Sequence, residues 1–178
     1  MKKCKFYLLI LCSILAESIY AQELVQVTDE TLTVNSVTAM TGYTRNKTEV
    51  TLPDRTSGYI YRISVFPKGT NPAGPSLFSL LKKLGSSNIS LASSFAEYAI
   101  ANNDNSSVDA FIFSSPDDAN NFYAKKDGYW NACKSMPNRV SCCFATKECM
   151  GKEVYFGFRN NNIMKGLDVK LEVVALVE

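Results

Sequence analysis

The sequence predicts a mainly β domain, a two-sheet β-sandwich of jelly-roll or Ig-like type with a short helical insertion in the middle of the chain. Short segments rich in β-branched and aromatic residues lie toward both ends. Residues 167–173 alternate apolar and charged side chains, as a strand with one solvated face requires. Residues 70–75 then introduce a different pattern, because their two prolines and one glycine prevent a strand from continuing.

Seven segments are predicted to be strands, a number that suits two packed sheets. They are residues 32–37, 48–52, 58–66, 108–113, 139–145, 153–158 and 167–177. The polar run Asn160, Asn161 and Asn162 predicts a hairpin turn into the last strand.

Three short helices are predicted within the segment from about 76 to 126. The first, 76–84, has Ser76 as its cap and a leucine stripe, and the second covers 91–101. The third follows Ser115 and carries two aspartates in its first turn, where the helix dipole favours them. We interpret the apolar stripes of all three as packing surfaces.

Residues 1–21 are predicted to be a signal peptide that is removed, leaving one domain of residues 22–178. Three lysines precede an apolar run that is too short to span a bilayer, and Ala21 offers a cleavage position. The alternative is a lipoprotein signal at Cys12, although Leu11 stands where a small residue is expected. The chain is therefore expected to be exported, to the periplasm, the cell surface or the extracellular space, with no transmembrane span.

The charge balance argues against a nucleic-acid partner. The whole chain has 19 basic and 17 acidic residues, and loss of the leader removes three lysines and Glu17, leaving 16 of each. This balance gives no support for a basic groove that binds phosphates or for a polybasic patch that binds membranes.

The chain contains no histidine, which excludes Ser-His-Asp and Cys-His nucleophiles and every His-ligated metal site. Phosphate-binding loops, dinucleotide fingerprints and nucleophile elbows are also absent from the sequence. We therefore expect a protein that is not an enzyme and has no cofactor and no metal. A hydrolase that uses two carboxylates remains a lower-ranked alternative.

Four of the six cysteines crowd into residues 133–149, namely Cys133, Cys142, Cys143 and Cys149. In an exported protein this pattern predicts two disulfides. A bridge between the adjacent Cys142 and Cys143 would strain the backbone, so Cys133 and Cys149 are each expected to pair with one of them. A four-thiolate zinc site is the alternative, but paired C-x-x-C knuckles are missing.

The candidate binding residues are Tyr129, Trp130 and Asn131, which lie between a helix end and the cysteine cluster and include the only tryptophan. An aromatic ring on a disulfide-held loop can stack on a sugar or anchor a protein. The competing interpretation places Trp130 in the sandwich core or against a disulfide. Tyr59 and Tyr61 share one strand face and could form either an exposed patch or part of the inner face.

Three function classes follow, in this order. The first is an exported, non-catalytic binding or accessory module whose ligand is a glycan. The second is a structural or interaction component of the cell envelope whose partner is an envelope protein. The third is the small carboxylate hydrolase.

Overall fold

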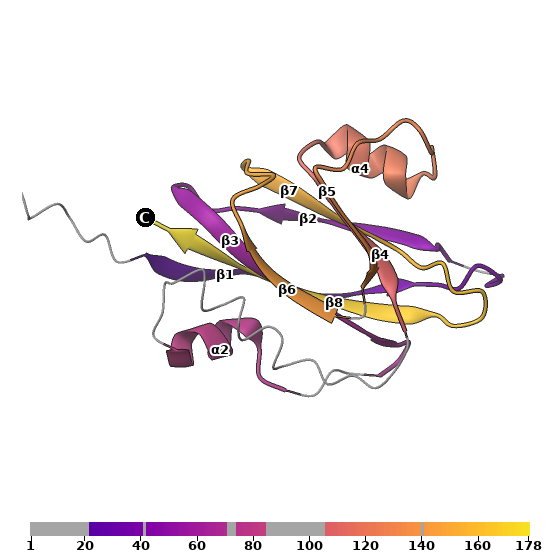
Figure 1. Cartoon of the computed structure of the whole chain (residues 1–178), viewed down its shortest axis with the longest axis horizontal. Helices are drawn as coiled ribbons and strands as arrows, with labels where there is room; N and C mark the ends of the chain where they lie inside the picture. Colours follow the sequence, from indigo (N-terminus) through magenta and orange to yellow (C-terminus); the bar gives the residue numbers. More distant parts are fainter. Residues whose placement is uncertain (1–21, 41, 71–73, 85–105, 140) are drawn as a thin grey trace, which may run out of the picture.

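Two antiparallel four-stranded sheets pack face to face in the computed structural model (Figure 1), which describes residues 22–40, 42–70, 74–84, 106–139 and 141–178. One sheet has the order β1-β8-β3-β6 and the other β2-β7-β4-β5; we call them sheet A and sheet B. The strands are β1 (Glu23–Val34), β2 (Arg45–Thr51), β3 (Thr56–Pro67), β4 (Val108–Phe113), β5 (Lys134–Arg139), β6 (Ser141–Thr146), β7 (Glu153–Arg159) and β8 (Leu167–Val177). The predicted β-sandwich is confirmed.

The strands pair in a nested order that identifies the sandwich as a jelly roll. The first pairs with the last, the second with the seventh, the third with the sixth and the fourth with the fifth, all antiparallel. Eight strands folded in this way form two linked Greek keys. Of the two sandwich types that the sequence allowed, the pairing selects the jelly roll.

The main core lies between the sheets and is built from alternate residues of each strand. Sheet A contributes Tyr59, Tyr61 and Ile63 from β3, and from β8 it contributes Leu167, Val169, Leu171 and Val173. Sheet B contributes Phe156 and Phe158 from β7 and their neighbours on β4. The period of two that predicted the strands therefore also separates inner from outer side chains.

A helix covers part of the outer face of each sheet, so the domain has four layers (Figure 1). Helix α2 (Leu77–Leu84) packs Leu77 and Leu81 on the outer face of sheet A. Helix α4 (Pro116–Tyr123) packs Ala119 and Phe122 on sheet B. Both helical stripes are thus packing surfaces, as predicted, and Asp117 and Asp118 do lie in the first turn of α4.

The Phe122 ring of helix α4 lies directly over Gly157 of sheet B. A β carbon at this position would lie 2.7 Å from Cε1 of Phe122 and 2.8 Å from Cε2 of Phe113. Glycine at this position leaves room for the two rings, so it allows α4 to pack closely on sheet B.

The strand boundaries differ from the prediction in two places. β1 starts at Glu23, earlier than expected, because this edge strand pairs with β8 over its whole length despite a polar composition. The segment predicted as one strand, 139–145, is instead divided between β5 and β6, which belong to different sheets. β5 contains Pro137 and the left-handed Asn138, which an edge strand tolerates but a central strand does not.

The predicted hairpin between the last two strands is wrong. β7 lies in sheet B and β8 in sheet A, so residues 160–166 cross from one sheet to the other. β7 pairs with β2 and β4, and β8 pairs with β1 and β3, so the two strands do not pair with each other. The predicted helix 91–101 and the predicted leader 1–21 lie outside the described residues.

Candidate functional site

The loop after α4 carries the three residues predicted to bind a ligand. The Tyr129 side chain is 76% exposed, and Asn131 is also exposed. Hydrogen bonds fix the loop against the helix: Nδ2 of Asn121 donates to the Tyr129 carbonyl oxygen at 3.0 Å, and the Asn131 amide donates to Oδ1 of Asp118 at 2.9 Å. The exposed aromatic ring is therefore presented on a backbone that is already ordered.

Trp130 is half-buried and lies outside the sandwich core, so the interpretation that placed it in that core is wrong. Its ring makes edge-to-face contacts with Phe111, Phe113 and Phe122, at centroid distances of 5.2, 5.9 and 5.4 Å. These rings belong to a small second core between α4 and sheet B, outside the sandwich core. Four mutually packed rings hold the indole in one orientation.

Asp127 connects the indole to a buried arginine. Oδ1 of Asp127 accepts from Nε1 of Trp130 at 3.4 Å and from Nη2 of Arg45 at 2.8 Å, and Oδ2 accepts from the same Nη2 at 3.0 Å. Nη1 of Arg45 donates to the Phe122 carbonyl oxygen at 2.9 Å, while the guanidinium lies 5.1 Å from the Phe122 ring centroid. Arg45 thus ties β2, α4 and the following loop together.

A second arginine lies beside this group, because Arg159 pairs with Arg45 in the register of β2 and β7. Its Nε and Nη2 donate to Oδ2 of Asp109 at 3.1 and 2.8 Å, and its guanidinium lies 5.4 Å from the Phe111 ring centroid. Nδ2 of Asn161 donates to the same oxygen at 2.7 Å. We name the group of Tyr129, Trp130, Asp127, Arg45 and Arg159 the aromatic–arginine face; Arg45 is its buried member, and Tyr129 and Asp127 are its exposed ones.

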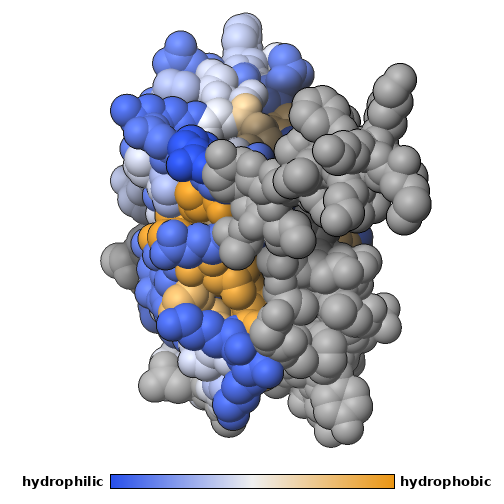
Figure 2. Space-filling model, turned by 90° about the vertical axis from the view of Figure 1, so that its left-hand side faces the viewer, coloured by the Kyte–Doolittle hydropathy of each residue, from blue (hydrophilic) through white to orange (hydrophobic). Residues whose placement is uncertain are grey.

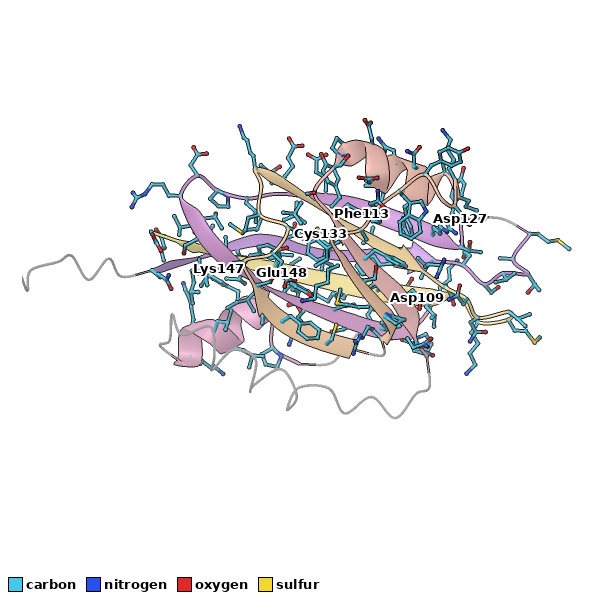
Figure 3. All side chains as sticks on the ribbon, turned by 45° about the horizontal axis from the view of Figure 1, so that its top comes forward. Asp109, Phe113, Asp127, Cys133, Lys147 and Glu148 are labelled. Atoms are coloured by element: carbon cyan, nitrogen blue, oxygen red, sulfur yellow. A yellow bond between two sulfur atoms is a disulfide. The ribbon has the colours of Figure 1, made fainter. Side chains whose placement is uncertain are left out.

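Asp127 and Asp109 come from different elements but lie toward the same end of the sandwich (Figure 3). Hydrogen bonding to Arg45 lowers the pKa of Asp127 below its ordinary value. Burial alone would raise the pKa of Asp109, but hydrogen bonds from the Asn138 amide, Arg159 and Asn161 outweigh it, so this pKa is also lowered. Both carboxylates are held in the ionised form.

The tyrosines predicted on one face of β3 belong to the interior. Tyr59 and Tyr61 are fully buried between the sheets, and burial raises the pKa of Tyr59. Arg62 lies on the opposite face, as predicted, where its guanidinium is 2.5 Å from Oε2 of Glu172. Oε1 of that carboxylate accepts from the Leu77 amide at 2.9 Å, so the ion pair anchors the first turn of α2.

The predicted cysteine pairing is wrong. Cys133 is bonded directly to Cys149, with Cα atoms 6.0 Å apart, and Cys142 is a free, buried thiol. Cys142 points into the sandwich core, where burial raises its pKa to about 11, so it is an apolar packing residue. The proximity of cysteines in the sequence did not show that the residue before β5 and the turn after β6 meet in space.

No cluster of three or more possible metal ligands occurs in the part of the chain that the structure describes. An open hollow of about 360 Å³ lies at the end of the sandwich opposite the aromatic–arginine face, lined by residues 52–56 and 150–152. Figure 2 views that end of the molecule and shows apolar surface between hydrophilic residues. The hollow does not bring paired carboxylates together.

The sequence predicted Tyr129, Trp130 and Asn131 as binding residues and gave no reason to group Arg45, Asp127 and Arg159 with them. The two arginines stand at strand ends far apart in the sequence, and only the pairing of β2 with β7 brings them together. The sequence did hold one clue to Arg159. An arginine that directly follows the apolar run of β7 has to pair with a carboxylate or stay in contact with water.

Comparison of the chain with protein-family models, curated proteins and solved structures finds no match. Within the described residues, no helix has both the length and the apolar character needed to cross a membrane.

Proposed function

We propose that the protein is an exported, non-catalytic binding module that recognises a glycan through the aromatic–arginine face. The observation that carries the proposal is the contrast between two adjacent aromatic residues. Trp130 is locked against three phenylalanines, while Tyr129 is 76% exposed on a hydrogen-bonded turn. The exposed ring of Tyr129 lies outside the second core, so it is free to contact a ligand while Trp130 holds the loop in place.

The chemistry of this face suits a sugar. The apolar side of a pyranose ring stacks on an aromatic side chain, and its hydroxyl groups pair with carboxylates and guanidinium groups at the edge of the ring. The Asp127 side chain is 64% exposed and that of Arg159 is 31% exposed, so both can accept further hydrogen-bond partners. Because their positions are already fixed, binding costs little additional ordering of side chains.

The lowered pKa values of Asp109 and Asp127 support binding of a glycan over its hydrolysis. A glycosidase needs one carboxyl group whose pKa is raised so that it can donate a proton near neutral pH. Asp109 and Asp127 have lowered pKa values and are held by arginines, so neither is suited to act as that acid.

The proposal of export rests on the predicted leader and is supported by the Cys133–Cys149 disulfide, since such bonds persist in oxidising compartments. The identity of the ligand would indicate the compartment outside the cytoplasm in which the protein acts. A structural glycan of the envelope would place it in the periplasm or at the cell surface.

A glycan array tests the proposal. The protein is applied alongside Tyr129→Ala, which removes the exposed ring, and Tyr129→Phe, which keeps the ring and loses only the hydroxyl group. We expect one glycan class to be bound by the wild type and Tyr129→Phe but not by Tyr129→Ala. Absence of binding to every glycan, together with a stoichiometric complex with one envelope protein, would favour the interaction-protein alternative.

A further inference from the structure

We infer that the end of the sandwich beside the aromatic–arginine face also carries a lipid-binding tip, which inserts apolar side chains into an anionic membrane surface. The tip consists of two loops, residues 35–40 with 42–44 between β1 and β2, and residues 160–166 between β7 and β8. Both loops lie at the end of the molecule opposite the C-terminus (Figure 1). This inference is independent of glycan recognition.

The loops contain most of the exposed apolar surface of the described residues. Five of the seven large hydrophobic side chains that are exposed in this part of the chain belong to them. They are Val37 (57%), Met40 (102%), Tyr43 (58%), Ile163 (63%) and Met164 (84%). Such side chains are ordinary when scattered singly, but their concentration at one end marks an interaction site.

The two loops are joined to each other by their backbones. The Val37 amide donates to the Asn162 carbonyl oxygen at 2.9 Å, and the Thr38 amide and hydroxyl both donate to the Ile163 carbonyl oxygen, at 3.2 and 2.5 Å. Nδ2 of Asn160 donates to the carbonyl oxygens of Val34 and Lys165, at 3.2 and 2.8 Å. The tip is therefore an ordered structure that holds its apolar side chains outward.

These hydrogen bonds also prepare the tip for an apolar environment. A backbone N–H or C=O that enters hydrocarbon without a partner costs several kcal/mol. In the second loop, Oδ1 of Asn162 accepts from the amides of Met164 and Lys165, both at 3.0 Å, and in the first loop the Asn35 amide donates to the Tyr43 carbonyl oxygen at 2.9 Å. The loops satisfy these polar groups internally while their apolar side chains face outward.

The charges around the tip select an anionic lipid surface. Neither loop contains an aspartate or glutamate, whereas Lys165 lies within the second loop and Lys68 lies on the adjacent turn, where its Nζ donates to Oδ1 of Asn35 at 3.0 Å. Both lysines are exposed. The nearby Asp168 is buried and accepts from the Thr33 hydroxyl and the Gly69 amide, so its charge faces inward. A lysine close to an anionic lipid surface is attracted to it, and this attraction adds to the burial of apolar side chains.

Tyr43 is positioned to lie at the level of the lipid headgroups. Its ring packs on that of Tyr123 with a centroid distance of 5.1 Å, at the side of the tip next to α4. Tyrosine is favoured at this depth because its ring is apolar and its hydroxyl group stays hydrated. A protein partner would favour a flat continuous patch, whereas Met40 and Met164 project from two separate loops.

Vesicle co-sedimentation tests the tip. Vesicles of phosphatidylcholine alone are compared with vesicles in which about a third of the lipid is phosphatidylglycerol. The double variant Met40→Asp/Met164→Asp removes the apolar apex, and Met150→Asp is the matched control, an exposed methionine at the opposite end of the sandwich. All proteins share the same N-terminus, so any contribution of residues 1–21 cancels in the comparison.

We expect the wild type and Met150→Asp to bind the anionic vesicles equally, and the double variant to bind at least about tenfold more weakly with an unchanged melting temperature. Lys68→Ser/Lys165→Ser should reduce the preference for anionic vesicles by roughly tenfold. Failure of the wild type to bind, or equal binding by the double variant, would overturn the inference. A dimer in solution that Met40→Asp/Met164→Asp dissociates would instead assign the tip to a second copy of the chain.

Discussion

Arg45 and Asp127 stand 82 residues apart in the sequence and form a two-contact ion pair, with Nη2 of Arg45 2.8 and 3.0 Å from the two carboxylate oxygens. The pair is asymmetric, because the arginine side chain is 7% exposed and the aspartate side chain is 64% exposed. Arg45 also donates to the Phe122 carbonyl oxygen, so it serves the fold as well as the surface.

This difference in exposure predicts that substitution of Arg45 lowers the free energy of unfolding more than substitution of Asp127. Arg45→Met should lower the free energy of unfolding by about 1 to 3 kcal/mol, since it removes three hydrogen bonds from a buried position. Asp127→Asn should cost under about 1 kcal/mol, because an exposed ion pair contributes little. Urea denaturation of both variants checks the prediction, and equal losses would show that the pair acts mainly through its charge.

The lowered pKa of Asp109 predicts a loss of stability in acid. The folded state favours ionised Asp109, so its contribution is complete above the ordinary carboxyl pKa of about 4 and disappears as the pH falls through the lower folded-state value. Asp109→Asn should therefore be less stable than the wild type at pH 7, and the difference should shrink below about pH 4. Thermal melts across this range measure it; a difference that stays constant with pH would contradict the assignment.

The contact at Gly157 predicts that α4 docks poorly once a methyl group is added. Gly157→Ala should cost about 1 to 3 kcal/mol, because Phe122 and Phe113 have to move apart. Gly166→Ala is the control, since its nearest neighbour is the flexible Lys68 side chain at 3.3 Å. The fluorescence of Trp130, which packs on the same rings, should change only in Gly157→Ala.

The corrected disulfide predicts one cross-linked peptide. Digestion without reduction, followed by mass spectrometry, should recover Cys133 joined to Cys149, and a link from either residue to Cys142 would contradict the structure. The bond closes a short loop of 16 residues, so Cys133→Ser/Cys149→Ser should reduce stability by about 3 kcal/mol.

The alternating and apolar patterns were sufficient to predict a sandwich, since most strands bury one face in every second residue. β5 escaped prediction because Pro137 and Asn138 oppose strand structure locally, while its place at the sheet edge permits them. The same local view predicted a hairpin at residues 160–162, because nothing in a turn sequence reveals that its two strands belong to different sheets.

The same limit of local patterns explains why only part of the aromatic–arginine face could be proposed from the sequence. Tyr129 and Trp130 are sequence neighbours and could be proposed together. The sequence did not show that Tyr129 is exposed while Trp130 is half-buried. Arg45, Arg159 and Asp127 meet only through strand pairing and the docking of α4. Long-range pairing of strands, which local patterns do not encode, therefore decides most of the aromatic–arginine face.

Glycan titration monitored by Trp130 fluorescence tests the central claim most directly, because the chain has a single tryptophan and it lies within the proposed site. A panel of neutral, amino and uronic-acid oligosaccharides is titrated into the wild type, Tyr129→Phe and Tyr129→Ala. The account predicts a saturable change in emission for one class of sugar, retained by Tyr129→Phe, lost in Tyr129→Ala and accompanied by no cleavage of the oligosaccharide. An emission that no sugar alters in the folded protein, or a shortened oligosaccharide in the reaction mixture, would contradict it.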